Sequence, residues 1–166
     1  SGKMIGLQSG NQVLTDTLAD GSVVTLNKQS TLAYREQFSG ESRTVVLEGE
    51  AFFNVASDKT KPFIIHVEDV DVTVLGTSFN IKRDSDKTEV IVETGKVEVS
   101  KKRYKIDVSP NEMAVVYDNQ PQPVKEKNTD ELYNYYRTKE FVCNATSLWK
   151  LVDVLNAAYS AHIVVR

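Results

Sequence analysis

Apolar and polar residues alternate along most of the chain between Gln12 and Tyr117. A period of two is typical of β-strands with one buried face, because successive side chains of a strand point to opposite sides. No stretch of this region keeps a helical period for three turns. The alternation predicts an all-β region with strands over residues 23–26, 44–47, 51–55, 63–67, 70–75, 78–81, 89–92, 96–99, 104–108 and 114–117.

Three glycines interrupt these predicted strands: Gly49, Gly76 and Gly95. A glycine within a strand pattern usually marks a bulge, a sharp corner or a close approach of another backbone. Because the spacing between the three glycines is uneven, we do not expect a regular solenoid. The pattern favours an irregular β-roll or a two-sheet sandwich in which strands bend from one layer to the other.

The pattern changes after residue 118. Pro121 and Pro123 lie among polar residues without apolar periodicity, which indicates a linker. Beyond them, apolar residues spaced three and four apart predict an amphipathic helix over residues 148–159. Short apolar runs at 141–143 and 163–165 predict a strand on each side of this helix, and thus a small C-terminal βαβ appendage.

The predicted organisation therefore has three parts. They are an all-β domain at 1–118, a linker at 119–130 and a partial βαβ module at 131–166. The opening Ser1-Gly2 is typical of a remnant of tag removal, so we expect the chain to be a fragment of a longer protein.

Composition narrows the class of function. The chain has 166 residues, of which 40% are hydrophobic and 26% charged, as expected for a globular protein. Its net charge of −3 shows no excess of the basic residues that bind nucleic acid. The single cysteine, Cys143, excludes an internal disulfide. No apolar run approaches the ~20 residues that a membrane-spanning helix needs.

No combination of residues predicts catalysis. The two histidines, His66 and His162, lie in apolar segments and lack the spacing of metal ligands. The sequence has no Gly-x-Ser-x-Gly motif and no glycine-rich phosphate loop. We therefore expect a non-enzymatic protein with no catalytic residues, cofactor or metal.

Several ordered segments resemble the domain of the FecR family. They are residues 18–32 (LADGSVVTLNKQSTL), 45–56 (VVLEGEAFFNVA), 62–67 (PFIIHV), 72–81 (VTVLGTSFNI), 93–99 (ETGKVEV) and 110–114 (PNEMA). In the last segment Asn111 stands where the family usually has glycine, and asparagine also tolerates the left-handed backbone conformation. The tail resembles the C-terminal module of FecR-like proteins from Bacteroides-type bacteria, with Lys139 in place of a glycine.

This resemblance implies a transmembrane anti-sigma regulator with a single span in the inner membrane. The chain would be its periplasmic sensor, which relays the state of an outer-membrane TonB-dependent transducer to an extracytoplasmic-function sigma factor. Its direct partner would be the signalling domain of that transducer. A cytoplasmic segment outside this chain would contact the sigma factor.

The tail module is related to the short N-terminal domain of secretins and TonB-dependent receptors, and its second half is absent here. We therefore expect an unpaired strand edge and part of an apolar helix face to be exposed to a partner. The candidate partner-binding residues are Leu148, Trp149, Leu151, Val152, Leu155, Ile163 and Val165. The four aliphatic helix residues would hold the module together, with Trp149 and residues 163–165 nearer the contact. In the alternative, the stripe packs onto the β domain and touches no partner.

Two other functions remain open from the sequence. A carbohydrate-binding β-sandwich of an envelope glycan system would display a strip of aromatic side chains, and four residues could supply it: Tyr34, Phe38, Tyr104 and Tyr117. An enzyme of cupin-like shape would need histidine ligands, which the chain lacks.

Overall fold

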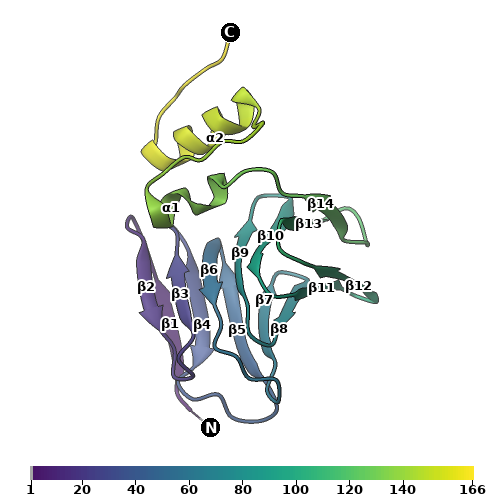
Figure 1. The fold of residues 1–166 in the computed structure, drawn as a ribbon. Coiled ribbons are helices and arrows are strands. Elements are labelled where there is room, and N and C mark those ends of the chain that lie inside the picture. Colours follow the sequence, from purple (N-terminus) through teal and green to yellow (C-terminus); the bar gives the residue numbers. More distant parts are fainter. Residues whose placement is uncertain (1) are drawn as a thin grey trace. The chain divides into compact units, whose positions relative to one another are not determined.

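The computed structural model describes residues 2–166. They form two compact units, unit 1 ending at Lys127 and unit 2 spanning Asn128–Arg166. The described part of unit 1 is built of β-strands, whereas unit 2 is helical (Figure 1). The prediction of a mainly β fold with a small C-terminal part is thus confirmed.

The strands of unit 1 form two seven-stranded sheets. The first sheet, in spatial order, consists of β1 (Met4–Gln8), β4 (Thr31–Arg35), β5 (Arg43–Glu48), β7 (Phe63–Val67), β8 (Val70–Val74), β11 (Val97–Lys101) and β12 (Tyr104–Val108). The second consists of β14 (Val124–Lys127), β13 (Glu112–Tyr117), β10 (Lys87–Thr94), β9 (Ser78–Arg83), β6 (Glu50–Asn54), β3 (Val23–Leu26) and β2 (Leu14–Thr17).

The chain crosses repeatedly from one sheet to the other. Hairpins β4–β5, β7–β8 and β11–β12 belong to the first sheet, and β9–β10 and β13–β14 to the second. Strands β5 and β7 are parallel neighbours, because the chain visits the second sheet as β6 between them. The arrangement is a two-sheet sandwich, one of the two architectures that the sequence favoured.

The three glycines lie where the chain changes sheet, between β5 and β6, β8 and β9, and β10 and β11. Gly49 has a φ of +92°, a conformation that side chains with a Cβ rarely adopt. Gly76 passes so close to another loop that a Cβ there would lie 2.7 Å from the Cα of Ser57. The prediction of turns or close approaches at these positions is confirmed. Asn111, at the next crossing, has a φ of +67°.

The core lies between the sheets, where the alternating inward residues of both meet in one cluster. At its centre the rings of Phe53 and Phe79 stack with centroids 5.3 Å apart, and Phe63 packs edge-on against Phe53 at 6.2 Å. All three side chains are fully buried. Because Phe63 comes from the first sheet and the other two from the second, they hold the layers together.

Unit 2 contains a short 3₁₀ helix, η1 (Leu132–Asn134), and two α-helices, α1 (Tyr135–Thr138) and α2 (Leu148–Tyr159). Helix α1 ends at Thr138 and is followed by Lys139, which has a left-handed φ of +65°. Helix α2 has the predicted bounds. Ser147 caps it by accepting a hydrogen bond at Oγ from the backbone N–H of Lys150, at 3.3 Å.

The structure corrects three local predictions. Residues 124–127 lie in the predicted linker but form β14, which pairs with β13. Residues 141–143 and 163–165 are not strands, so the predicted βαβ appendage is a helical unit instead. A strand needs a neighbour to bond with, and no strand pairs with either segment in the described part of the chain.

Candidate functional site

Arg43 is a charged residue at an inward position of the first sheet. Along β5 it shares a face with Val45 and Leu47, which are buried, and its own side chain is only 2% exposed. Its guanidinium lies over the ring of Phe63, 5.3 Å from the centroid. A buried guanidinium requires nearby acceptors for its N–H groups.

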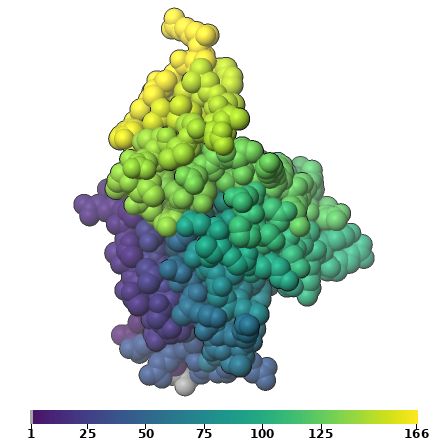
Figure 2. Space-filling model, in the orientation of Figure 1, coloured from purple at the N-terminus to yellow at the C-terminus, as the bar shows by residue number. Residues whose placement is uncertain are grey.

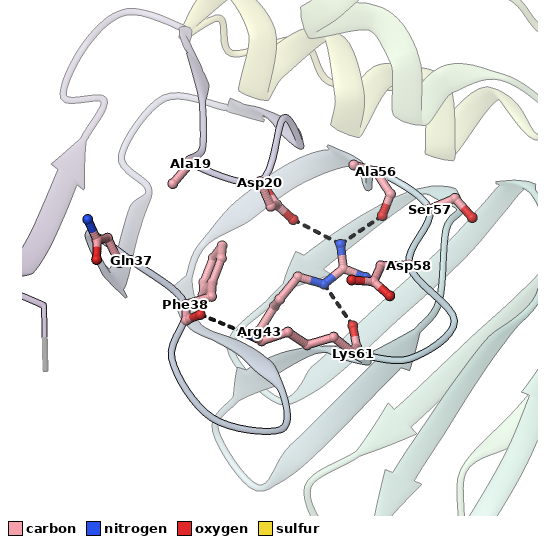
Figure 3. A pocket seen from close by; sticks show the side chains of 9 residues that line it. All are labelled: Ala19, Asp20, Gln37, Phe38, Arg43, Ala56, Ser57, Asp58 and Lys61. Atoms are coloured by element: carbon pink, nitrogen blue, oxygen red, sulfur yellow. Dashed lines mark hydrogen bonds and ion pairs between the residues drawn. The ribbon is translucent and has the colours of Figure 1, made fainter.

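Two loops supply the closest of these acceptors (Figure 3), and the carbonyl oxygen of Leu75, after β8, lies 3.5 Å from Nη2. Nη1 donates to Oδ2 of Asp20 at 2.9 Å and to the carbonyl oxygen of Ala56 at 2.7 Å, and Nε donates to the carbonyl oxygen of Lys61 at 2.8 Å. Asp20 also accepts from Ser22, from its backbone N–H at 2.9 Å and its hydroxyl at 2.8 Å. The Asp-Gly-Ser turn is thereby tied to the loop after β6.

A pocket of about 400 Å³ opens beside this network. It is lined by Ala19, Asp20, Gln37, Phe38, Arg43, Ala56, Ser57, Asp58 and Lys61. Hydrogen bonds from the side chain and backbone of Thr60 hold the pKa of Asp58 below its ordinary value. Lys61 Nζ donates to the carbonyl oxygen of Phe38. Both cations of the lining are therefore engaged with protein acceptors.

The chemistry of this pocket is limited. Its lining holds two carboxylates and two cations but no histidine or cysteine. It offers no nucleophile paired with a base, which acyl or phosphoryl transfer would require. Within residues 2–166, no three histidine, cysteine, aspartate or glutamate side chains are grouped to hold a metal ion. The arrangement fits a structural support for two loops.

The predicted partner-binding residues lie in unit 2. They form two groups that differ in how much of each side chain is exposed. Val152 is buried, and Leu151, Leu155 and Val165 are half-buried. Leu148, Trp149 and Ile163 are exposed, by 57%, 63% and 45% of their surface. Leu148 was expected to hold the module together, and its side chain lies in the first turn of α2 with more than half of its surface exposed.

Polar contacts fix the two ends of α2. Near its start, Lys150 Nζ lies 2.6 Å from Oδ2 of the buried Asp130, whose Oδ1 accepts from the backbone N–H of Leu132 at 3.1 Å. Near its end, the side-chain amide of Asn156 bonds both backbone groups of Ile163, at 2.8 and 3.1 Å. The side-chain amide of Asn156 thus bonds the N–H and C=O groups of Ile163, which a neighbouring strand would bond in a sheet.

Two further apolar residues of unit 2 are exposed, Tyr159 at 68% and Val164 at 65%. The sequence pattern had placed Tyr159 on the apolar stripe of the helix. Val164 lies between Ile163 and Val165, both of which were predicted to bind a partner. In unit 1, reasoning from the sequence missed Arg43. Its signal was present, because a charged residue in phase with Val45 and Leu47 must bury its charge.

The aromatic strip required for glycan binding does not form. Tyr34 is buried, and its ring lies 6.4 Å from that of Phe38, which itself packs on Phe63 at 5.8 Å. Tyr104 and Tyr117 lie on strands of different sheets. Tyr34 and Phe38 therefore contribute to packing.

Comparison of the sequence with known protein families identifies the family to which this chain belongs. The family model described as FecR protein matches residues 8–98. The chain belongs to the FecR family. The segments that resembled the family in the sequence include the Asp-Gly-Ser turn, the loop after β6 and the sheet-crossing glycines. In a FecR domain these motif residues thus serve the fold.

Two solved structures extend the likeness across the chain. One is a candidate anti-sigma factor from Parabacteroides distasonis at 2.50 Å, with 32% identity, a TM-score of 0.82 and coverage of 95% of this chain and 76% of the other. A second candidate anti-sigma factor from the same organism, at 1.65 Å, has 26% identity and a TM-score of 0.73, with 94% and 92% covered. No curated protein matches the chain.

FecR proteins are membrane-anchored regulators with a periplasmic domain, and the family match with these two structures supports an anti-sigma regulatory role. Within residues 2–166, none of the helices has the length and apolar character needed to cross a membrane.

Proposed function

We propose that this chain is the periplasmic sensor portion of a FecR-like anti-sigma regulator. It receives the state of an outer-membrane TonB-dependent transducer through the transducer's signalling domain and relays it to an extracytoplasmic-function sigma factor. The parent protein has a single span in the inner membrane, and a separate cytoplasmic segment contacts the sigma factor. The sensor works by binding and carries out no catalysis.

The observation that carries this proposal is the exposed apolar surface of unit 2. Its members are Leu148, Trp149, Tyr159, Ile163 and Val164, each between 45% and 68% exposed. Large apolar side chains that remain exposed are available for contact with a protein partner, and tryptophan is among the residues that contribute most to such contacts. The surface fits a protein partner such as the signalling domain.

The backbone near this surface also suits a protein partner. Asn156 occupies both backbone groups of Ile163, which holds the segment after α2 in one position. In the described chain no strand pairs with residues 163–165, so the backbone groups of the neighbours of Ile163 have no strand partner. A strand of the signalling domain could bond to those groups, as in partner recognition by strand addition.

A transcriptional reporter tests the proposal in cells. The parent protein, with or without Trp149→Ala, is produced with a reporter under the sigma factor, and the signalling domain is produced in the periplasm as the stimulus. We expect the wild type to induce the reporter and the variant to stay at its uninduced level. Asp153→Ala, which changes an exposed polar residue of the same helix, serves as the control.

Protein levels measured by immunoblot separate lost signalling from lost protein. If the Trp149→Ala variant is present at normal abundance and the reporter is fully induced, Trp149 is not part of the contact with the signalling domain. A signalling domain that leaves the wild type uninduced would reject the relay itself.

A further inference from the structure

The two sheets of unit 1 end in four edge strands, β1 and β12 in the first sheet and β2 and β14 in the second. An exposed edge offers unpaired backbone groups to other chains, and proteins commonly block it with charged side chains. Three of these strands contain charges: Lys105 and Asp107 in β12, Lys125, Glu126 and Lys127 in β14, and Asp16 in β2. Strand β1, with the sequence MIGLQ, contains none.

The hydrogen bonds between β1 and β4 show which backbone groups point to the open edge. Glu36 N–H donates to the carbonyl oxygen of Lys3 at 2.8 Å, and Ser9 N–H donates to that of Ser30 at 3.1 Å. In an antiparallel pair, bonded positions alternate with positions whose groups face away. Residues 4, 6 and 8 therefore direct their N–H and C=O groups away from β4, where no strand pairs with them in the described chain.

The side chains of β1 leave this edge open to approach. Ile5 and Leu7 pack against the core on the inner face. On the outer face Met4 is 55% exposed, and a Cβ added to Gly6 would meet nothing within 4 Å. The N-terminal residues, in purple, form one margin of unit 1 in the space-filling view (Figure 2).

We propose that β1 pairs with β1 of a second copy of this chain, antiparallel and centred on Gly6, so that two first sheets join into one. A two-fold axis at Gly6 puts Gly6 opposite itself and Met4 opposite Gln8 of the second copy. The backbone N–H and C=O groups of residues 4, 6 and 8 in each strand then have hydrogen-bond partners in the other strand. The same register places Ile5 opposite Leu7 of the second copy, which continues the apolar inner face across the junction.

A second copy is the occupant that these observations favour. A two-fold contact uses the same patch on both chains, and β1 suits this because it carries no charge to repel its own copy and brings apolar Ile5 and Leu7 together across the axis. Strand β1 also lies almost wholly upstream of the FecR match, which begins at residue 8. A contact of five residues per chain is small, so the dimer should be weak and form only at high protein concentration.

Charge substitutions at the centre of the pairing test the proposal by sedimentation equilibrium. The wild type should dimerise as its concentration rises towards about 1 mM. Gly6→Lys and Gly6→Asp should each be monomeric, because like charges would lie directly opposite one another. An equimolar mixture of the two variants should dimerise again, since the charges are then opposite. Thr15→Lys, on the exposed edge strand of the other sheet, should dimerise like the wild type.

Circular dichroism melts confirm that each variant is folded before it is scored. The proposal is overturned if the wild type stays monomeric at the highest concentration, or if the single Gly6 variants dimerise as well as the wild type. It is also overturned if mixing the folded variants restores no dimer.

Discussion

Arg43 joins separate segments of unit 1 through one guanidinium group. It bonds the Asp20 turn and both ends of the loop between β6 and β7, and it covers the face of Phe63. A buried ion pair gains little over apolar packing, but removing one partner leaves the other charge buried without compensation. The stability of this corner of the sandwich therefore depends on Arg43.

Arg43→Met should lower the free energy of unfolding by about 3–5 kcal/mol, because it strands Asp20 and two carbonyl oxygens without their donor. Urea denaturation measures the change. Arg103→Met, at an exposed cation of the β11–β12 turn, should change it by less than about 0.5 kcal/mol. A loss below about 1 kcal/mol at Arg43 would show that solvent replaces its contacts.

Glu50 is another charged side chain buried in unit 1, as are Arg43 and Lys101. Its Oε1 accepts from Asn27 Nδ2 at 2.7 Å and its Oε2 from Asn80 Nδ2 at 2.9 Å. Burial nevertheless raises the pKa of Glu50 above its ordinary value of 4.5, since removal from water disfavours the charged form. The folded state thus holds this proton more tightly than the unfolded state does.

The stability contributed at Glu50 should fall as pH rises from about 4.5 through the raised pKa, because the folded state binds more protons across that window. Glu50→Gln removes the titrating group and keeps an oxygen that can accept from an asparagine. Its stability relative to the wild type should therefore increase with pH over the same window. Urea unfolding at a series of pH values checks this, and parallel curves for the two proteins would contradict it.

Strands β6 and β9 bring together the largest side chains of the sandwich. They pair antiparallel with Phe53 opposite Phe79, so the two rings stack on the inner face. Such a cross-strand pair stabilises the second sheet and fills the space between the layers.

Phe79→Ala should destabilise unit 1 by about 3–5 kcal/mol, because it removes a fully buried ring and leaves a cavity beside Phe53. Thermal and urea unfolding provide the measurement. Met4→Ala, at an exposed side chain of β1, should cost less than about 0.5 kcal/mol. A similar cost for both variants would mean that the inward face of β9 has been misassigned.

The elements that the sequence predicted well have a strong period. Strand β7 (Phe63–Val67) alternates buried and half-buried residues, and helix α2 keeps its apolar spacing from Leu148 to Tyr159. Strand β14 was missed because all four of its residues are exposed, so no apolar face marks it. Residues 141–143 and 163–165 were wrongly predicted as strands, because an apolar run carries no information about whether a partner strand is present.

The candidate site was only partly predictable. The helical period placed Trp149 beside the apolar stripe, and the side chain is exposed. The same period grouped Leu148 with the inward residues, although its side chain is more than half exposed. The acceptors around Arg43 come from residues 13 to 32 positions away along the chain, so only the folded chain reveals them.

The whole chain combines a FecR β-sandwich with a small helical unit. The sandwich buries its charged groups in local networks and has no catalytic grouping in its pocket. The helical unit instead exposes apolar side chains. This contrast supports a division of labour in which unit 1 is a scaffold and unit 2 makes the proposed contact with the transducer.

Titration of the purified chain with the signalling domain of the transducer, by isothermal calorimetry, measures that contact. The proposal predicts saturable binding that Trp149→Ala weakens by about tenfold or more, with an unchanged melting temperature, while Asp153→Ala binds like the wild type. Wild-type affinity for Trp149→Ala, or a loss of affinity that only follows a loss of stability, would contradict the assignment of this surface to the transducer.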